Sequence, residues 1–280
     1  MTSQPALTVV VPVLNESASI EPTLRQLVAQ AKIEEVIVVD NGSDDDTAHV
    51  VQEFAIRHPK VVLLHEPVRG ITFARNAGFD KARGDIIART DADTVVSDEW
   101  GATILGFLAE NPDTAAVTGL CTYHDSPVGF LLRWGQRLMI RTRQLGGPVG
   151  NMYGPNMALR RTAWLQVREH TQHRADVAED LDLALCLLER HLRIEQLTTM
   201  RAQTSARRRR TSPTRQWQFQ MIGLRTLRDH GIEPRLVDRV VVTLAWLTHT
   251  IQWPIYRWWD FGRRRFSLHP GIERVSSVGR

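Results

Sequence analysis

The chain has 280 residues, of which 42% are hydrophobic and 24% are charged, and its formal net charge is +4 with a pI of about 9.5. These values are typical of a soluble globular protein with a well-buried core, arranged as one large domain with or without an appendage. Cys121 and Cys186 lie in apolar stretches without metal-ligand spacing, which argues against a cysteine-stabilised scaffold and indicates a reducing compartment. The N-terminal residues lack the basic start and long apolar stretch of a signal peptide, so we expect a cytoplasmic protein.

Short β-branched runs alternate with helical patterns over the first two thirds of the chain. We expect strands at residues 7–14, 36–39, 61–64, 85–89, 115–120, 156–160 and 193–197. We expect helices at residues 18–31, 46–57, 72–82, 97–110, 128–145 and 178–190. Parallel neighbours need crossover connections, so this alternation predicts an α/β fold with a mostly parallel, doubly wound sheet flanked by helices.

Polar side chains follow the ends of the predicted strands. Asn15 and Glu16 follow the first strand, Asp40 ends the second, and Asp91 and Asp93 follow the fourth. Two carboxylates at i and i+2 after a buried strand can both face one hard cation, although acidic turns without a ligand are also common. Functional residues of such sheets gather beyond the carboxyl ends of the strands, and this shared edge therefore favours a binding site.

Five motifs in order resemble a known family. They are VVPVLNE (10–16), VIVVDNGSDDDT (36–47), ARNAGFDKARGDIIARTDAD (74–93), GPNMALRR (154–161) and EDLDLAL (179–185). Each motif alone is weak, but their order and spacing are similar to those of the inverting glycosyltransferases of family 2, which have the GT-A fold. The resemblance covers roughly residues 7–198 and implies transfer of a sugar from a nucleotide-sugar donor.

The resemblance implies roles for individual residues of the donor site. The nucleotide pocket would be lined by Pro12, Asn15, Glu16, Asp40, Arg75 and Asn76. Asp40 would accept a hydrogen bond from the base, usually uracil, whose ring nitrogen is a donor. Asp91 would lie near the ribose and the metal, and Asp93 would coordinate Mg2+ or Mn2+ on the diphosphate. The alternative for Arg75 is a salt bridge that braces the sheet edge.

Glu179 and Asp180 match the acidic pair that carries the general base in this family. An acceptor hydroxyl becomes a good nucleophile when a positioned carboxylate takes its proton. We expect Asp180 to be this base and Glu179 to orient it or to contact the acceptor. Acidic residues also favour the first turn of a helix, so the pair is in addition typical of a helix start.

The last part of the chain is basic and aromatic, and the resemblance is weaker there. No acidic residue occurs from Arg201 to Arg228, a composition that suits phosphate, anionic lipid or nucleic acid. Residues 240–259 are rich in tryptophan and aliphatic side chains, which fits either an interfacial anchor or a helix packed on the catalytic domain. Residues 128–145 mix apolar side chains with arginines and favour a surface helix over a membrane contact.

We therefore expect a catalytic domain over residues 1–200 and a helical extension over residues 201–280. The expected protein is a cytoplasmic enzyme, with peripheral contact to the inner face of the membrane through residues 201–265 as one alternative. Its expected partners are a nucleotide-sugar donor, with UDP-sugar preferred, and a carbohydrate or lipid-linked acceptor.

Two other classes of function fit the sequence less well. A nucleotidyltransferase that makes a nucleotide sugar would normally carry a glycine-rich loop with Arg and Lys after the first strand, where this chain has Leu14, Asn15 and Glu16. A nucleic-acid binder built on the arginine block (residues 201–228) would show interleaved aromatic residues, and the block offers only Trp217 and Phe219. We therefore expect no nucleic-acid partner.

Overall fold

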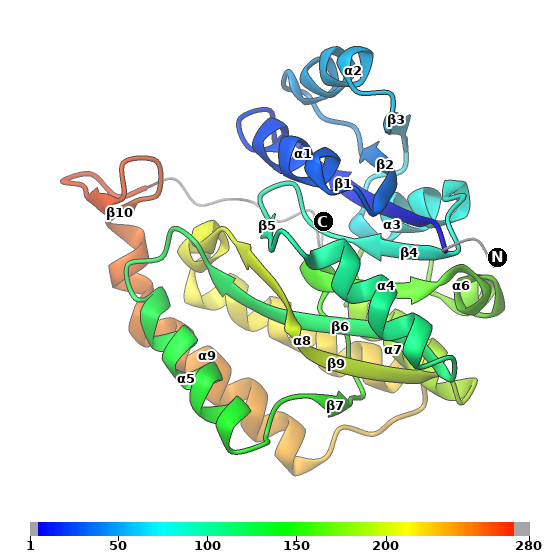
Figure 1. Cartoon of the computed structure of the whole chain (residues 1–280). Helices are drawn as coiled ribbons and strands as arrows, with labels where there is room; N and C mark the ends of the chain where they lie inside the picture. Colours follow the sequence, from blue (N-terminus) through cyan, green and yellow to red (C-terminus); the bar gives the residue numbers. More distant parts are fainter. Residues whose placement is uncertain (1–4, 272–280) are drawn as a thin grey trace.

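A computed structural model describes residues 5–271 of the chain, and residues 1–4 and 272–280 of the two expected domains lie outside it (Figure 1). The strands of the main sheet are β1 (Leu7–Val13), β2 (Ile33–Asp40), β3 (Val61–His65), β4 (Ile86–Arg89), β5 (Val95–Val96), β6 (Thr114–Tyr123), β7 (Gly147–Pro148), β8 (Met157–Arg160) and β9 (Arg193–Thr204). The α-helices are α1 (Ile20–Ala29), α2 (Thr47–Arg57), α3 (Ile71–Lys81), α4 (Trp100–Glu110), α5 (Gly129–Arg141), α6 (Arg161–Val167), α7 (Glu179–Glu189), α8 (Pro213–Asp229) and α9 (Leu236–Arg257). Short 3-10 helices are η1 (Gly154–Asn156), η2 (Arg168–His170) and η3 (Ala206–Arg210), and β10 (Trp259–Asp260) and β11 (Arg265–Phe266) form a separate hairpin.

The main sheet has the strand order β3-β2-β1-β4-β8-β6-β9-β5, with β7 paired to β9. Strands β1 to β4 are parallel to one another, and β6 is parallel to β9, which confirms the expected α/β fold. The exceptions are the two-residue strands β5 and β7, which pair antiparallel with β9, and β8, which lies antiparallel between β4 and β6. This reversal brings the loop before β8 to the same edge as the end of β4.

Helices cover both faces of the sheet because alternate side chains of its strands point to opposite sides. On one face, Val9 and Val11 pack in a cluster with helix residues such as Leu24 and Trp100. On the other face, Val10 belongs to a second cluster that includes residues of α3, α6 and α7. Both faces of β1 are therefore buried, which explains why its sequence is continuously apolar.

A glycine allows α3 to approach the sheet closely. A Cβ added at Gly78 would lie 2.3 Å from Cγ1 of Val10 and 2.9 Å from Cγ2 of Val39. Those distances are shorter than van der Waals contact, so any larger residue would push the helix away. The helix that carries Arg75 and Asn76 is thus held at a fixed distance from the strands.

The C-terminal segment continues directly from the sheet. Strand β9 pairs with β6 as far as Thr204, so the sheet extends past residue 200, where the sequence placed the end of the catalytic domain. From there η3 leads into α8 and α9, which pack against each other, and α9 also contacts η3. No helix within residues 5–271 has both the length and the apolar character that crossing a membrane requires.

Candidate active site

The loops at the carboxyl ends of β1 and β4 and the segment after β9 meet at one group of charges. Nη2 of Arg207 lies 2.7 Å from Oδ2 of Asp93 and 2.9 Å from Oε2 of Glu16. Asp93 also accepts a hydrogen bond from the hydroxyl of Thr204 at 3.2 Å. The structure thus brings together the predicted residues Glu16 and Asp93, which are 77 positions apart in the sequence, around a cationic side chain.

A second group of charged side chains runs from Asp91 through Arg89 to Glu179. Nη2 of Arg89 lies 3.1 Å from Oδ1 of Asp91, and Nη1 of the same guanidinium binds Oε1 of Glu179. Arg89 is buried at the end of β4, so its charge is stabilised by these two carboxylates. Burial by itself would lower the pKa of Arg89, but the charges of Glu179 and Asp91 raise it above its ordinary value.

Arg75 holds the other side of the Glu179 carboxylate. Its Nη1 lies 3.2 Å from Oε2 of Glu179, while its Nε and Nη2 donate to Oδ1 of Asn76 at 2.9 and 2.8 Å. Arg75 is fully buried and Asn76 nearly so, with the Asn76 amide donating to Thr171 at 3.2 Å. These contacts match the alternative in which Arg75 forms a salt bridge that braces the sheet edge. Direct contact of either residue with a donor remains a prediction from the resemblance.

The electrostatic environments of Glu179 and Asp180 differ, although the two residues are adjacent. Burial favours the neutral form of Glu179, but Arg89 and Arg75 outweigh it and lower the pKa of Glu179. Burial and then the charge of Glu179 raise the pKa of Asp180 to about 6. The ionised form of Glu179 is therefore favoured by its arginine partners, whereas Asp180 can exchange a proton near neutral pH.

Asp180 is oriented from both sides at the start of α7. Its Oδ1 accepts a hydrogen bond from the backbone N–H of Leu181 at 2.9 Å, and its Oδ2 accepts one from the N–H of Gly154 at 3.3 Å. Gly154 begins η1 in the loop before β8, and a Cβ there would lie 2.6 Å from Nη1 of Arg89. The loop before β8, the expected base and Arg89 are therefore in close contact.

The predicted base-recognition residues lie at the ends of β1 and β2. Oδ1 of Asp40 accepts a hydrogen bond from the N–H of Ser43 at 3.2 Å, and Oδ2 lies 3.4 Å from Nδ1 of His65. The side chain of Asn15 makes two hydrogen bonds to Asp44 in the loop after β2. Its Nδ2 donates to Oδ1 of Asp44 at 2.6 Å, and its Oδ1 accepts from the Asp44 N–H at 3.0 Å. Pro12 is buried within β1, where it is paired in register with Val39 of β2.

The residues around Asp93 fit a hard divalent cation. Carboxylate and hydroxyl oxygens are the preferred ligands of Mg2+ and Mn2+, and Asp91, Asp93 and Thr204 supply them. Burial raises the pKa of Asp91 and the charge of Asp93 adds to this rise, although Arg89 opposes both. Neighbouring carboxylates that repel each other in this way are stabilised by added positive charge. The guanidinium of Arg207 provides such a charge next to Asp93.

Sequence reasoning missed the two arginines that organise the site. Arg89 is a charged residue at the end of an otherwise apolar strand, a position where an unpaired charge is rare, and this was the available signal. Arg207 lies in the arginine block, and composition marked the block without distinguishing one arginine from the next.

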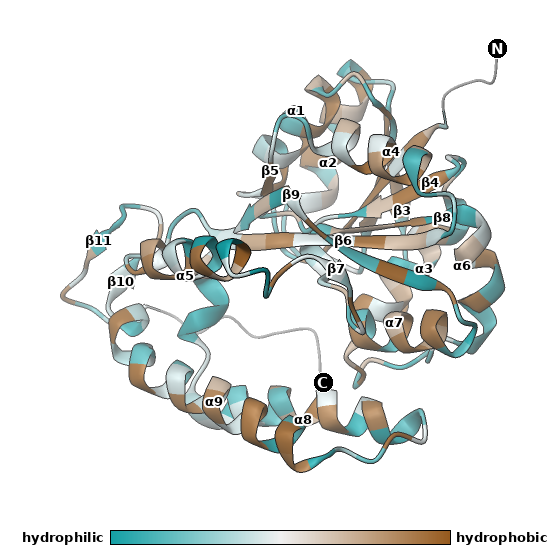
Figure 2. Cartoon of the chain, turned by 60° about the horizontal axis from the view of Figure 1, so that its bottom comes forward, coloured by the Kyte–Doolittle hydropathy of each residue, from teal (hydrophilic) through white to brown (hydrophobic). Residues whose placement is uncertain are grey.

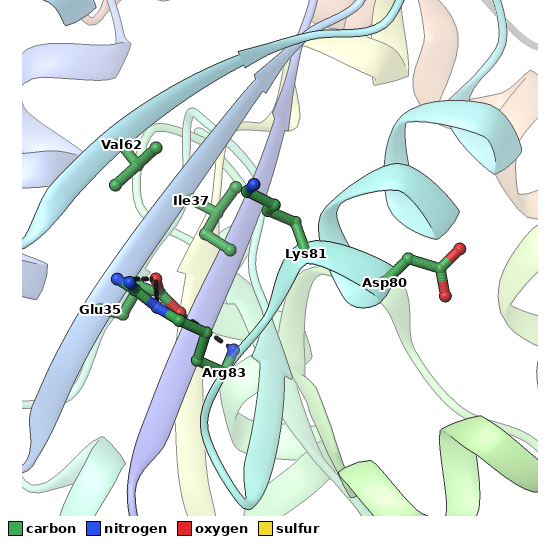
Figure 3. A pocket seen from close by; sticks show the side chains of 6 residues that line it. All are labelled: Glu35, Ile37, Val62, Asp80, Lys81 and Arg83. Atoms are coloured by element: carbon green, nitrogen blue, oxygen red, sulfur yellow. Dashed lines mark hydrogen bonds and ion pairs between the residues drawn. The ribbon is translucent and has the colours of Figure 1, made fainter.

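A surface hollow elsewhere in the molecule is unrelated to these residues. It is lined by Glu35, Ile37, Val62, Asp80, Lys81 and Arg83 (Figure 3). Glu35 lies near the start of β2, whereas Asp40 ends that strand, so the hollow is at the opposite end of the sheet from the acidic cluster. Nη2 of Arg83 lies 2.6 Å from Oε1 of Glu35, and we regard this ion pair as structural.

The fold and the site define an α/β transferase of the GT-A type, and comparisons identify its family. The profile of glycosyl transferase family 2 matches residues 8–167. Because this span is more than half of the chain, the protein belongs to glycosyl transferase family 2. The family resemblance seen in the motifs is therefore confirmed.

Similar proteins agree with this assignment. The chain is 30% identical over 186 residues to dolichyl-phosphate beta-glucosyltransferase ALG5C of Trichomonas vaginalis, covering 59% of this chain and 55% of that protein. It is 33% identical over 105 residues to glycosyltransferase AglE of Haloferax volcanii, covering 36% of this chain and 34% of that protein. The matched region is thus about a third to just over half of these relatives' length.

A solved structure confirms the GT-A fold. The mannosyltransferase PcManGT of Pyrobaculum calidifontis, determined in complex with GDP-Man and Mn2+, superimposes with a TM-score of 0.65 at 22% sequence identity. The superposition covers 91% of this chain and 74% of that chain.

Proposed function

We propose that the protein transfers a sugar from a nucleotide-sugar donor to an acceptor hydroxyl, with inversion at the anomeric carbon and with Mg2+ or Mn2+ as cofactor. The observation that supports this best is the continuous ion-pair chain from Asp91 through Arg89 to Glu179, the residue next to Asp180. In this proposal the diphosphate site and the base lie at one edge of the sheet. A single-displacement transfer needs both in one place.

In the proposed reaction Asp180 is the general base. The acceptor oxygen attacks the anomeric carbon while its proton passes to a carboxylate oxygen of Asp180, and the bond between that carbon and the diphosphate oxygen breaks. A pKa of about 6 suits this role because the group is ionised at neutral pH yet still basic enough to accept a proton. Attack from the face opposite the leaving diphosphate inverts the centre without a covalent sugar–enzyme intermediate.

The donor side of the site would be held by acidic and basic groups together. Asp91 and Asp93 would hold the divalent ion, which supplies Lewis-acid stabilisation to the departing diphosphate when bound. Arg207 contacts one of these carboxylates, Asp93, and also Glu16, and its planar guanidinium suits phosphate oxygens. We propose that Arg207 moves from Asp93 to the diphosphate when the donor binds.

The base of the donor is proposed to contact Asp40. A carboxylate accepts the N–H of uracil, and it also accepts the two adjacent N–H groups of guanine, so this residue is compatible with UDP-sugars and with GDP-sugars. The similar mannosyltransferase was determined with GDP-Man. We retain a UDP-sugar as the proposed donor and treat guanosine as the competing outcome.

A lipid-linked acceptor is proposed from similarity. One relative is named a dolichyl-phosphate beta-glucosyltransferase, and its matched region covers 59% of this chain. The proposed catalytic domain over residues 1–200 would then carry Asp180 and the metal-binding acids, and the proposed extension over residues 201–280 would contribute Arg207 to the donor site.

The direct test is a thermal-shift screen of UDP, GDP, CDP and ADP, each with Mn2+ and with EDTA. A ligand that binds only the folded state raises the unfolding temperature, so UDP with Mn2+ should stabilise the protein and UDP with EDTA should not. Stabilisation by GDP and not by UDP would identify a GDP-sugar as the donor. Pyrophosphate release from a sugar phosphate and a nucleoside triphosphate would instead favour a nucleotidyltransferase.

A further inference from the structure

Helix α9 exposes an apolar stripe along its length. Leu236, Val240, Leu244, Leu247 and Ile251 recur every three or four residues, and their exposed fractions range from 42% to 78%. This spacing places all five on one side of the helix, where a globular protein normally buries such residues in its core. An exposed stripe of this size marks an interaction surface.

The opposite side of α9 is already packed against the protein. Nε2 of His249 contacts the carbonyl of Thr211 at 2.8 Å, and Nε1 of Trp246 donates to the carbonyl of Pro213 at 2.8 Å. The described residues therefore pack against one side of α9, and the apolar stripe is on the other side.

Helix α5 adds arginines and a second exposed apolar face. Trp134 is 65% exposed, and Phe130 and Leu138, four residues to either side of it, are 57% and 49% exposed. Arg137 and Arg141 lie next to these side chains on the same helix, and no acidic residue occurs anywhere from 126 to 168. Apolar and aromatic residues beside unpaired arginines are typical of a helix that lies in a membrane interface.

The two helices converge on the β10–β11 hairpin. The hydroxyls of Ser126 and Tyr256 lie 2.8 Å apart, and Nε1 of Trp259 donates to the carbonyl of Asp125 at 2.8 Å. Both cartoon views show the hairpin extending outward beyond the adjoining ends of α5 and α9 (Figures 1 and 2). The hairpin carries the exposed consecutive arginines 263–265 and the exposed Phe266.

We propose that the outward faces of α5 and α9 together with the β10–β11 hairpin form a docking surface for an anionic lipid bilayer. The apolar side chains would enter the headgroup region, and the arginines would pair with lipid phosphates. Contact is interfacial, since no helix in residues 5–271 is suited to span a bilayer. This inference rests on the exposed surface and goes beyond the proposed transfer reaction.

Charge favours a membrane over a second copy of the chain. A two-fold dimer through this surface would apply the same patch to itself and would bring arginines against arginines. Within α5, α9 and the hairpin the acids are Asp238 and Asp260, and they are outnumbered by arginines 133, 137, 141, 239, 257 and 263–265. An anionic leaflet supplies the missing negative charge.

The packed side of α9, opposite the stripe, is connected to the active site through η3. Nε1 of Trp253 in α9 donates to the carbonyl of Arg210 at 3.1 Å, and Arg207 at the other end of η3 binds Asp93. The helix that carries the stripe is therefore linked to the donor site, with the stripe itself on the far side of α9 from η3.

Vesicle flotation tests the inference with the full-length protein. The wild type should float with vesicles of phosphatidylcholine and phosphatidylglycerol at low salt, and should float poorly with phosphatidylcholine alone. Leu244→Glu with Ile251→Glu should reduce the partition coefficient by about tenfold or more, since two apolar side chains lose their burial. Arg137→Gln with Arg141→Gln should reduce it by about tenfold and weaken its salt dependence.

The matched control is Ile56→Glu, because Ile56 is 80% exposed and lies on α2, at the far end of the molecule from α9 (Figures 1 and 2). It should bind vesicles like the wild type, and the variants should keep the wild-type unfolding temperature. If Leu244→Glu with Ile251→Glu lowers the unfolding temperature, the inference is tested with Arg137→Gln and Arg141→Gln, because both of these arginines are exposed.

Three results would overturn the inference. One is no flotation of the wild type with anionic vesicles, and another is an equal loss in Ile56→Glu. The third is a wild-type dimer in sedimentation velocity that Leu244→Glu with Ile251→Glu dissociates. Since no donor or acceptor is present in these assays, their failure is separable from failure of the proposed transfer activity.

Discussion

Arg89 and Glu179 form a buried ion pair between the end of β4 and the start of α7, across 90 positions of sequence. The same guanidinium reaches Asp91, so one arginine connects the proposed metal site with the helix that presents Asp180. Arg75 binds the second oxygen of Glu179 and completes the neutralisation of that carboxylate. The position of the expected base is thus coupled to the strand that carries the acidic cluster.

Replacing Glu179 by Gln should destabilise the fold strongly. The amide would leave the buried Arg75 without its ion-pair partner and Arg89 with Asp91 alone, and breaking a buried pair in this way costs about 3–5 kcal/mol. Urea unfolding measures the loss, with Asp180→Asn as the neighbouring control, because Asp180 binds backbone N–H groups and no arginine directly. Equal stability of Glu179→Gln and wild type would contradict the buried-pair assignment.

The same carboxylate predicts the direction of acid sensitivity. The pKa of Glu179 is lowered in the folded state, so its stabilising contribution is complete above its ordinary pKa of 4.5 and is lost as the pH falls below that value. In Glu179→Gln this part of the pH dependence should disappear. Unfolding free energies measured in steps from pH 6 to pH 3 compare the two proteins.

The pH profile of transfer should follow Asp180. Because its pKa is raised to about 6 and the ionised form is the base, kcat/KM should fall about tenfold per pH unit below pH 6 and level off above it. Asp180→Asn should lose about 10²–10⁴-fold in kcat and lose this limb of the profile. A variant that keeps the wild-type limb would show that another group is the base.

The sequence predicted where the candidate residues lie relative to the strands. Continuous apolar runs indicate buried strands, and polar residues follow them, so the positions of Asp40, Asp91 and Asp93 at strand ends could be predicted before the structure was known. The expected α/β fold depended on the same local signals. The strand ends were within a few residues of those observed for β1 to β4.

Features that depend on long-range packing could not be predicted. The antiparallel insertion of β8 has no periodic signal, because a four-residue apolar strand reads the same in either direction. The roles of Arg89 and Arg207 depend on which carboxylates the topology brings to them. The length of β9 past residue 200 was missed because polar and apolar residues alternate there over an arginine-rich stretch.

Two glycine substitutions should have opposite effects on stability. Gly78→Ala would force a Cβ to within 2.3 Å of Val10 and should cost about 1–3 kcal/mol by overpacking. Gly106 lies in α4, where no described atom is within 4 Å of an added Cβ, so Gly106→Ala should stabilise by about 0.4–1 kcal/mol. Urea unfolding of both variants distinguishes close helix–sheet contact from helix propensity alone, which would predict stabilisation in each.

Arg207 and a divalent ion should compete for the same carboxylates. Its Nη2 lies within 2.7 Å of Asp93 and 2.9 Å of Glu16, and a cation arriving there would be repelled by the guanidinium. Arg207→Gln should therefore increase Mn2+ affinity, measured by electron paramagnetic resonance without nucleotide, by about threefold to tenfold, as expected for a partly exposed charge pair. Asp93→Asn should abolish this binding.

Arg209→Gln is the matched control for that measurement, because Nε of Arg209 donates to the hydroxyl of Tyr123 at 3.2 Å rather than to a carboxylate. Its Mn2+ affinity should equal that of the wild type. An unchanged affinity in Arg207→Gln would mean that the ion and the guanidinium use different carboxylates. In that case Arg207 would have no reason to leave Asp93 when the metal binds, and its proposed transfer to the diphosphate would be wrong.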